Sequence, residues 1–61
     1  MTMLPNDPLL LMSVVNTKLR DFYKDLDDLC DDLNENRAAL EAKLAAAGYV
    51  YDEARNQFVR R

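Results

Sequence analysis

The chain has 61 residues, of which 49% are hydrophobic and 31% charged, and its formal net charge is −3. This composition predicts one small folded domain, and the acidic balance gives no general attraction to nucleic acid or to an anionic membrane. The single cysteine and the lack of histidine exclude an internal disulfide and the usual zinc sites, and they favour a reducing, cytoplasmic environment.

Residues 1–6 are expected to form an irregular lead. The apolar run from Leu9 to Met12, with Val14 and Val15, lacks a basic leader and a small-residue cleavage site, so we expect neither a signal peptide nor a membrane span there. Asp7 and Pro8 then predict the start of a helix over residues 8–23, because the carboxylate can cap the first turn and proline needs no N–H partner there. Steps of 100° place one set of apolar side chains on a face that would cover a core: Leu11, Met12, Val15, Leu19, Phe22 and Tyr23.

Apolar residues outside that face predict a second contact surface on the same helix. Leu10 and Val14 lie four residues apart on its flank, and Met3 and Leu4 precede it. We expect these four residues to mediate self-association through a two-fold contact, unless the N-terminal lead folds back over the helix.

The middle of the chain predicts two further helices joined by a tight turn. Asp25 can cap a helix over residues 26–33, Asn34 tolerates a left-handed backbone, and Asn36 can cap a helix over residues 37–47 that ends before Gly48. The predicted inner faces carry Leu26, Leu29, Cys30, Leu33, Leu40, Leu44 and Ala47. Cys30 is therefore expected to be buried near Leu19 and Leu40 and to be unreactive.

Residues 49–59 are rich in aromatic and β-branched side chains and predict a β-hairpin. If Asn56 is left-handed and closes a four-residue loop, Tyr51 opposes Phe58 and Val50 opposes Val59. The predicted fold is mostly α, a three-helix core with a helix-turn-helix-like pair followed by a C-terminal β-hairpin, resembling a reduced winged helix. The tyrosines are expected at the rim of the core.

This order of elements raises the possibility of DNA binding, with candidate contacts at Arg37, Lys43, Arg55 and Arg60. The third helix would present outward alanines that cannot read base edges, and the aspartates of the second helix would repel phosphates. DNA binding is therefore the alternative hypothesis and not the favoured one.

The polar string from Asn16 to Asp21 surrounds a single buried leucine. Asn16, Lys18 and Arg20 are candidates for a polar contact site, and a structural hydrogen-bond network explains the string equally well. We predict no catalytic residue, cofactor or metal site, because the chain offers no histidine, no glycine-rich phosphate loop and no calcium-loop spacing.

Four strings carry a resemblance that spans nearly the whole chain: Leu4 to Pro8, Val15 to Asp21, Gly48 to Asp52 and Asn56 to Phe58. With these strings the chain resembles the domain-of-unknown-function 4250 family of short bacterial proteins. The resemblance implies a free-standing bacterial protein and brings no activity, cofactor or partner with it. We expect a non-catalytic domain that binds a protein partner or itself, the alternative being a helix-turn-helix-type DNA-binding regulator or its accessory.

Overall fold

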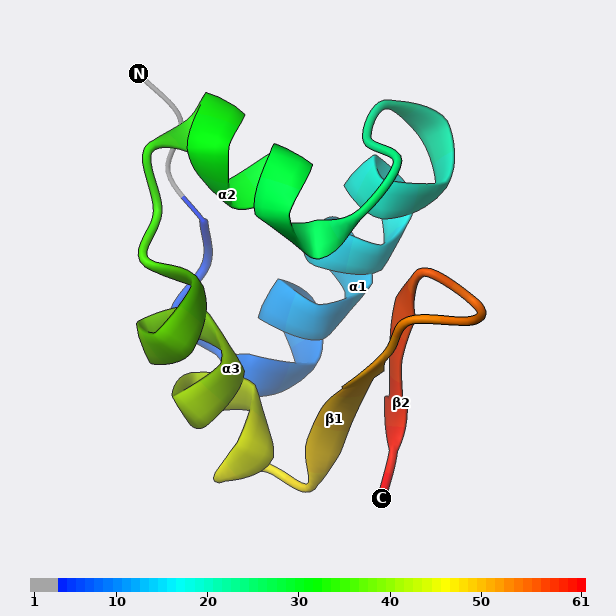
Figure 1. The fold of residues 1–61 in the computed structure, drawn as a ribbon. Coiled ribbons are helices and arrows are strands. Elements are labelled where there is room, and N and C mark those ends of the chain that lie inside the picture. Colours follow the sequence, from blue (N-terminus) through cyan, green and yellow to red (C-terminus); the bar gives the residue numbers. More distant parts are fainter. Residues whose placement is uncertain (1–3) are drawn as a thin grey trace.

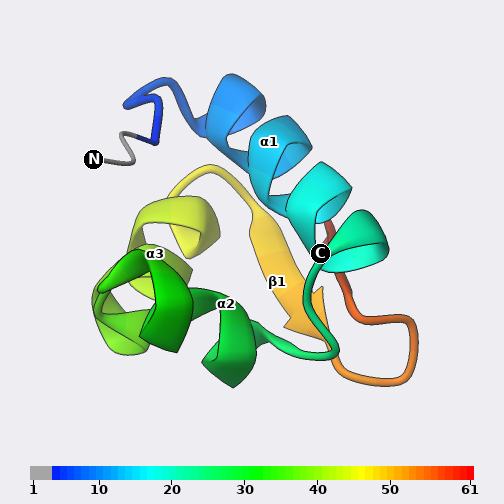
Figure 2. The ribbon, with the colours of Figure 1, turned by 90° about the horizontal axis from the view of Figure 1, so that it is seen from above.

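The computed structural model describes residues 4–61 as three helices followed by a two-stranded antiparallel sheet (Figure 1). The elements, in chain order, are α1 (Pro8–Asp21), α2 (Leu26–Leu33), α3 (Arg37–Ala45), β1 (Tyr49–Asp52) and β2 (Gln57–Arg60). The predicted fold class, a mostly helical domain with a C-terminal hairpin, is confirmed. In the view of Figure 2, β1 lies between α1 on one side and α2 with α3 on the other.

The three helices begin where the sequence predicts, because each has a side chain that accepts a backbone N–H of its first turn. Asp7 accepts from the N–H of Leu9 at 2.9 Å, Asp25 from Asp28 at 2.7 Å, and Asn36 from Ala39 at 2.9 Å.

The first helix ends two residues earlier than predicted, and the placement of Phe22 on the core face is wrong. Phe22 is the C-cap of α1, with φ −127° and ψ −24°, so its side chain leaves the helical path and is 72% exposed. The backbone N–H groups of Phe22 and Tyr23 both donate to the carbonyl of Lys18, which closes the last turn. Tyr23, one residue further on, packs against the core instead.

The third helix also ends two residues early, at Ala45, and Ala47 lies exposed in the turn that follows. The N–H of Gly48 donates to the carbonyl of Ala45 at 2.9 Å, and Gly48 has φ +92°. The left-handed backbone at Gly48 therefore turns the chain into β1, as the sequence predicts, although the last residues before it are not α-helical.

The hairpin has the predicted register, with Tyr51 opposite Phe58 and Val50 opposite Val59. Asn56 is left-handed, with φ 52°, and closes the loop between the strands. Strand β2 lies beside α1 and β1 beside α3, so the hairpin joins the first helix to the third.

The buried core draws on every helix and on β2. Its members are Leu11, Val15, Leu19, Leu26, Leu29, Cys30, Leu40, Leu44 and Phe58. Tyr23, Tyr49 and Tyr51 are partly buried and pack against it, which confirms that they form its rim, and Met12 and Leu33 do the same.

Candidate binding groove

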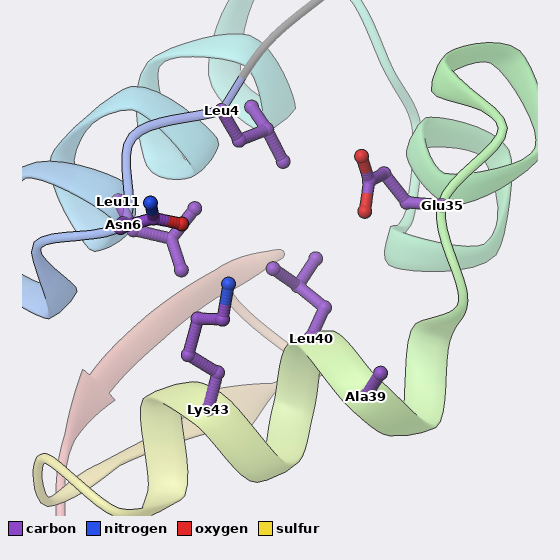
Figure 3. Close-up of a pocket in the computed structure, with 7 residues that line it drawn as sticks. All are labelled: Leu4, Asn6, Leu11, Glu35, Ala39, Leu40 and Lys43. Carbon is purple, nitrogen blue, oxygen red and sulfur yellow. The ribbon is translucent and has the colours of Figure 1, made fainter.

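An open groove of about 370 Å³ lies between the N-terminal lead, α1, the α2–α3 turn and α3. Figure 3 shows the side chains of Leu4, Leu11 and Leu40 directed toward one another inside it, and the short side chain of Ala39 at its edge. Leu11 is 1% and Leu40 5% exposed, so the groove reaches the margin of the hydrophobic core.

Two opposite charges stand on either side of this groove. Figure 3 shows the amino group of Lys43 on the side of Asn6 and Leu11, and the Glu35 carboxylate on the other side. Within residues 4–61 neither charge forms an ion pair with another side chain. The groove therefore combines apolar contact area with one free cation and one free anion of the described chain.

Exposed leucines on α1 form a second candidate surface. Leu9 is 58% and Leu10 57% exposed, whereas Val14 is half-buried. Leu4 packs against the core and lines the groove, and the predicted contact at Met3 lies outside the described residues. The exposure of Leu9 was not predicted, because the same 100° steps place it next to Tyr23, at the edge of the core face.

Asn16, one of the candidate polar contacts, is used inside the domain. Its side-chain Oδ1 accepts from the backbone N–H of Phe58 at 2.7 Å, and its Nδ2 donates to the carbonyl of Phe58 at 3.0 Å. Because β2 pairs with β1 on its other edge, Asn16 satisfies the free edge of this strand as a neighbouring strand would. The structure thus explains one member of the polar string.

The remaining members of that string lie at the surface. Arg20 forms a bidentate pair with Asp21, at 2.9 and 3.0 Å, and this hydrogen bonding lowers the pKa of the Asp21 carboxyl. Lys18 is half-buried and has no ion pair within residues 4–61. Of the three candidate polar residues, Asn16 and Arg20 line the same groove beside the hairpin, whereas Lys18 does not line it.

Asn56 and Tyr51 form a second internal junction. The Nδ2 of Asn56 donates to the carbonyls of Leu19 and Tyr23, both at 3.1 Å, and so caps the end of α1. Its Oδ1 accepts from the Tyr51 hydroxyl at 2.6 Å, and that hydroxyl accepts from the N–H of Leu26, at the start of α2, at 3.1 Å. One turn residue of the hairpin thus connects the end of one helix to the beginning of the next.

The candidate nucleic-acid contacts do not form one basic surface. Arg37 donates to Glu41 at 2.8 Å and pairs with Asp27 at 2.9 Å, which raises the pKa of its guanidinium above the ordinary value. Lys43 stands at the groove, and Arg55 and Arg60 lie on the hairpin. The exposed face of α3 carries Ala38, Ala39, Ala42 and Lys43.

Cys30 is 4% exposed and belongs to the core, and its burial raises the pKa of the thiol. Within residues 4–61, no group of three or more histidine, cysteine or acidic side chains could hold a metal ion. None of the helices in that range is long and apolar enough to cross a bilayer.

The structure defines a small domain of three helices and a hairpin, with a groove at the margin of its core. Residues 5–58 match the family described as "Domain of unknown function (DUF4250)", and the chain belongs to this family. No curated protein and no solved structure matches the chain.

Proposed function

We propose that this domain is non-catalytic and acts by self-association, the first contact being made by the outer surface of α1. The observation that carries this proposal is the exposure of two adjacent leucines, Leu9 at 58% and Leu10 at 57%, on a helix whose other face covers the core. Adjacent exposed leucines mark surfaces that gain free energy when a partner covers them.

The expected affinity follows from the area that the leucines can still bury. A full leucine side chain contributes about 1.5–3 kcal/mol, so four leucines that are each a little over half exposed contribute roughly 3–7 kcal/mol to a two-fold dimer. Association costs offset part of this gain, and a dimer with a Kd of about 1 mM needs about 4.1 kcal/mol. The leucines alone therefore do not hold a dimer together, and further contacts along α1 must add to them to give a weak dimer at high micromolar concentration.

Sedimentation velocity from about 10 to 500 μM tests the proposal, a range chosen for a weak dimer. The wild-type mass should rise with concentration, and the variant Leu9→Gln/Leu10→Gln should remain monomeric. Ala38→Gln/Ala42→Gln, which alters two exposed positions on α3 instead of α1, is the matched control and should associate like the wild type. A wild-type protein that is monomeric over the whole range would refute self-association.

DNA binding is the second candidate function, and the observation that favours it is the order of three helices followed by a hairpin with Arg55 and Arg60. The pairing of Arg37 with two carboxylates and the alanines of α3 argue against it. Titration of mixed duplexes at about 50 mM salt, where electrostatic attraction is strong, decides between the two. A submicromolar complex that weakens on Lys43→Ala with Arg60→Ala would replace self-association as the proposed function.

A further inference from the structure

A second groove, of about 500 Å³, lies between α1 and the loop of the hairpin and will be called the polar groove. Helix α1 contributes Ser13, Thr17 and Arg20 to its lining, and the hairpin contributes Arg55 and Gln57. Its lining contains two arginines and no carboxylate, although the protein has a net charge of −3. The lining of the groove in Figure 3, in contrast, contains one cation, Lys43, and one anion, Glu35.

Internal hydrogen bonds hold the two walls of the polar groove in place. Asn16 and Asn56 also line it, and they fasten β2 and the hairpin loop to α1 through the contacts with Phe58 and Leu19 described above. The backbone N–H of Arg55 donates to the Asp52 carboxylate at 3.2 Å, which orders the loop. The backbones that carry the two arginines are therefore set before any ligand arrives, which lowers the entropic cost of binding.

Hydrogen-bond donors in the groove remain available. Arg20 donates from Nε and one terminal nitrogen to Asp21, and its other terminal nitrogen has no partner among residues 4–61. The Nε of Arg55 is 3.8 Å from the nearer Asp52 oxygen, beyond hydrogen-bonding distance. Within residues 4–61, the hydroxyl of Ser13 and the side-chain amide of Gln57 have no hydrogen-bond partner in the protein.

We infer that the polar groove binds a small phosphate monoester, whose phosphate lies between Arg20 and Arg55 and whose organic part contacts Ser13 and Gln57. Guanidinium groups match the geometry of phosphate oxygens, and a dianion competes effectively with the single charges of Asp21 and Asp52. A volume of about 500 Å³ lies within the range of small-ligand sites. This assignment does not depend on self-association. It gives Arg20, in the polar string of α1, a role in ligand binding, whereas Asn16 of the same string has a structural role.

Backbone amide NMR shifts provide the test, with ribose 5-phosphate, ribose and inorganic phosphate as probes at constant ionic strength and neutral pH. Ribose 5-phosphate should give saturable shifts concentrated at Ser13, Thr17, Arg55 and Gln57. Inorganic phosphate should bind more weakly at the same place, and ribose should give no saturable shifts. Each difference follows from the loss of one part of the ligand.

Variants of the arginines distinguish a specific binding site from a nonspecific attraction of anions to positive charge. Arg20→Gln and Arg55→Gln should each weaken binding by at least about fivefold, and Arg55→Lys by less, because lysine retains charge but not the two-pronged geometry. Arg60→Gln removes the same charge from the hairpin outside the groove and should leave the affinity within about twofold. Both arginine side chains are about 70% exposed, so the variants should fold, which melting curves check.

Three results would overturn the inference. The first is the absence of saturable shifts with ribose 5-phosphate at tens of millimolar. The second is an equal loss of affinity in Arg60→Gln and Arg55→Gln, which would indicate a diffuse electrostatic effect. The third is tighter binding of a single-stranded oligonucleotide without a terminal phosphate, which would assign the groove to nucleic acid instead.

Discussion

Replacing Asn16 by alanine should destabilise the domain far more than its position among surface polar residues suggests. The side chain makes two hydrogen bonds to the backbone of Phe58, at 2.7 and 3.0 Å, and Phe58 is 2% exposed. Asn16→Ala leaves an N–H and a carbonyl at the edge of β2 without their partner, in a partly buried place that water reaches poorly.

The size of the effect can be worked out from these contacts. Two lost hydrogen bonds and the desolvated groups that remain correspond to about 2–4 kcal/mol. A domain of 61 residues has a total stability of roughly 3–9 kcal/mol at typical values per residue. Since about 1 kcal/mol shifts the Tm of such a domain by 4–8 °C, Asn16→Ala should lower the Tm by at least about 8 °C.

Thermal unfolding followed by circular dichroism measures this shift, with Thr17→Ala as the matched control on the next, exposed residue. That control should stay within about 0.5 kcal/mol of the wild type. A melting temperature of Asn16→Ala within about 3 °C of the wild type would refute the role given to this side chain.

Asn16→Asp adds a pH test of the same contact. The introduced carboxyl can still accept from the Phe58 N–H, but in its charged form it faces the Phe58 carbonyl, so folding raises its pKa above the unfolded value of about 3.9. The contribution of this carboxyl to the free energy of unfolding is then fully present below the unfolded pKa and is lost as the pH rises through the folded pKa. Relative to Asn16→Ala at each pH, the aspartate variant should be more stable in acid and should lose this advantage toward neutrality.

Two other changes test the backbone and the core. Gly48→Ala should cost about 1–2 kcal/mol through its backbone alone, because φ is +92° and, within residues 4–61, no residue beyond the chain neighbours of Gly48 has an atom within 4 Å of the added Cβ. Urea titration measures this cost, and an unchanged midpoint would contradict it. Cys30 should react slowly with a thiol reagent, and because burial raises its pKa, its contribution to stability should be lost as the pH rises above about 8.5. Between about pH 8 and 9.5 the variant Cys30→Ala should show a weaker pH dependence of unfolding, and rapid labelling of the native wild type would refute the buried placement.

Features set by neighbouring residues could be predicted from the sequence. Asp25 and Asn36 cap their helices, and Asn34, Asn56 and Gly48 adopt the left-handed backbone, because each of these effects acts within a few residues. The register of the hairpin followed from the left-handed turn for the same reason.

Features that depend on distant segments could not be predicted in the same way. The partner of Asn16 lies 42 residues away in β2, and no local pattern indicates which backbone groups would remain free there. The helical periodicity places Phe22 on the core face only if the helix extends to that residue. Because α1 ends at Asp21, the side chain of Phe22 lies in solvent instead. Arg20 and Arg55 line the same groove because the hairpin packs against α1, and the order of elements alone does not specify this packing.

The junction at Asn56 has a consequence for how the native protein opens. Detaching the hairpin would remove the hydrogen bonds to Leu19 and Tyr23 at the end of α1 and, through Tyr51, the bond to the first N–H of α2. Short terminal hairpins often fray as independent units, but here fraying would release two helix ends at once. We therefore expect the hairpin and the first two helices to form one cooperative unit, and the strand amides that are hydrogen-bonded should exchange with solvent only when the whole domain unfolds.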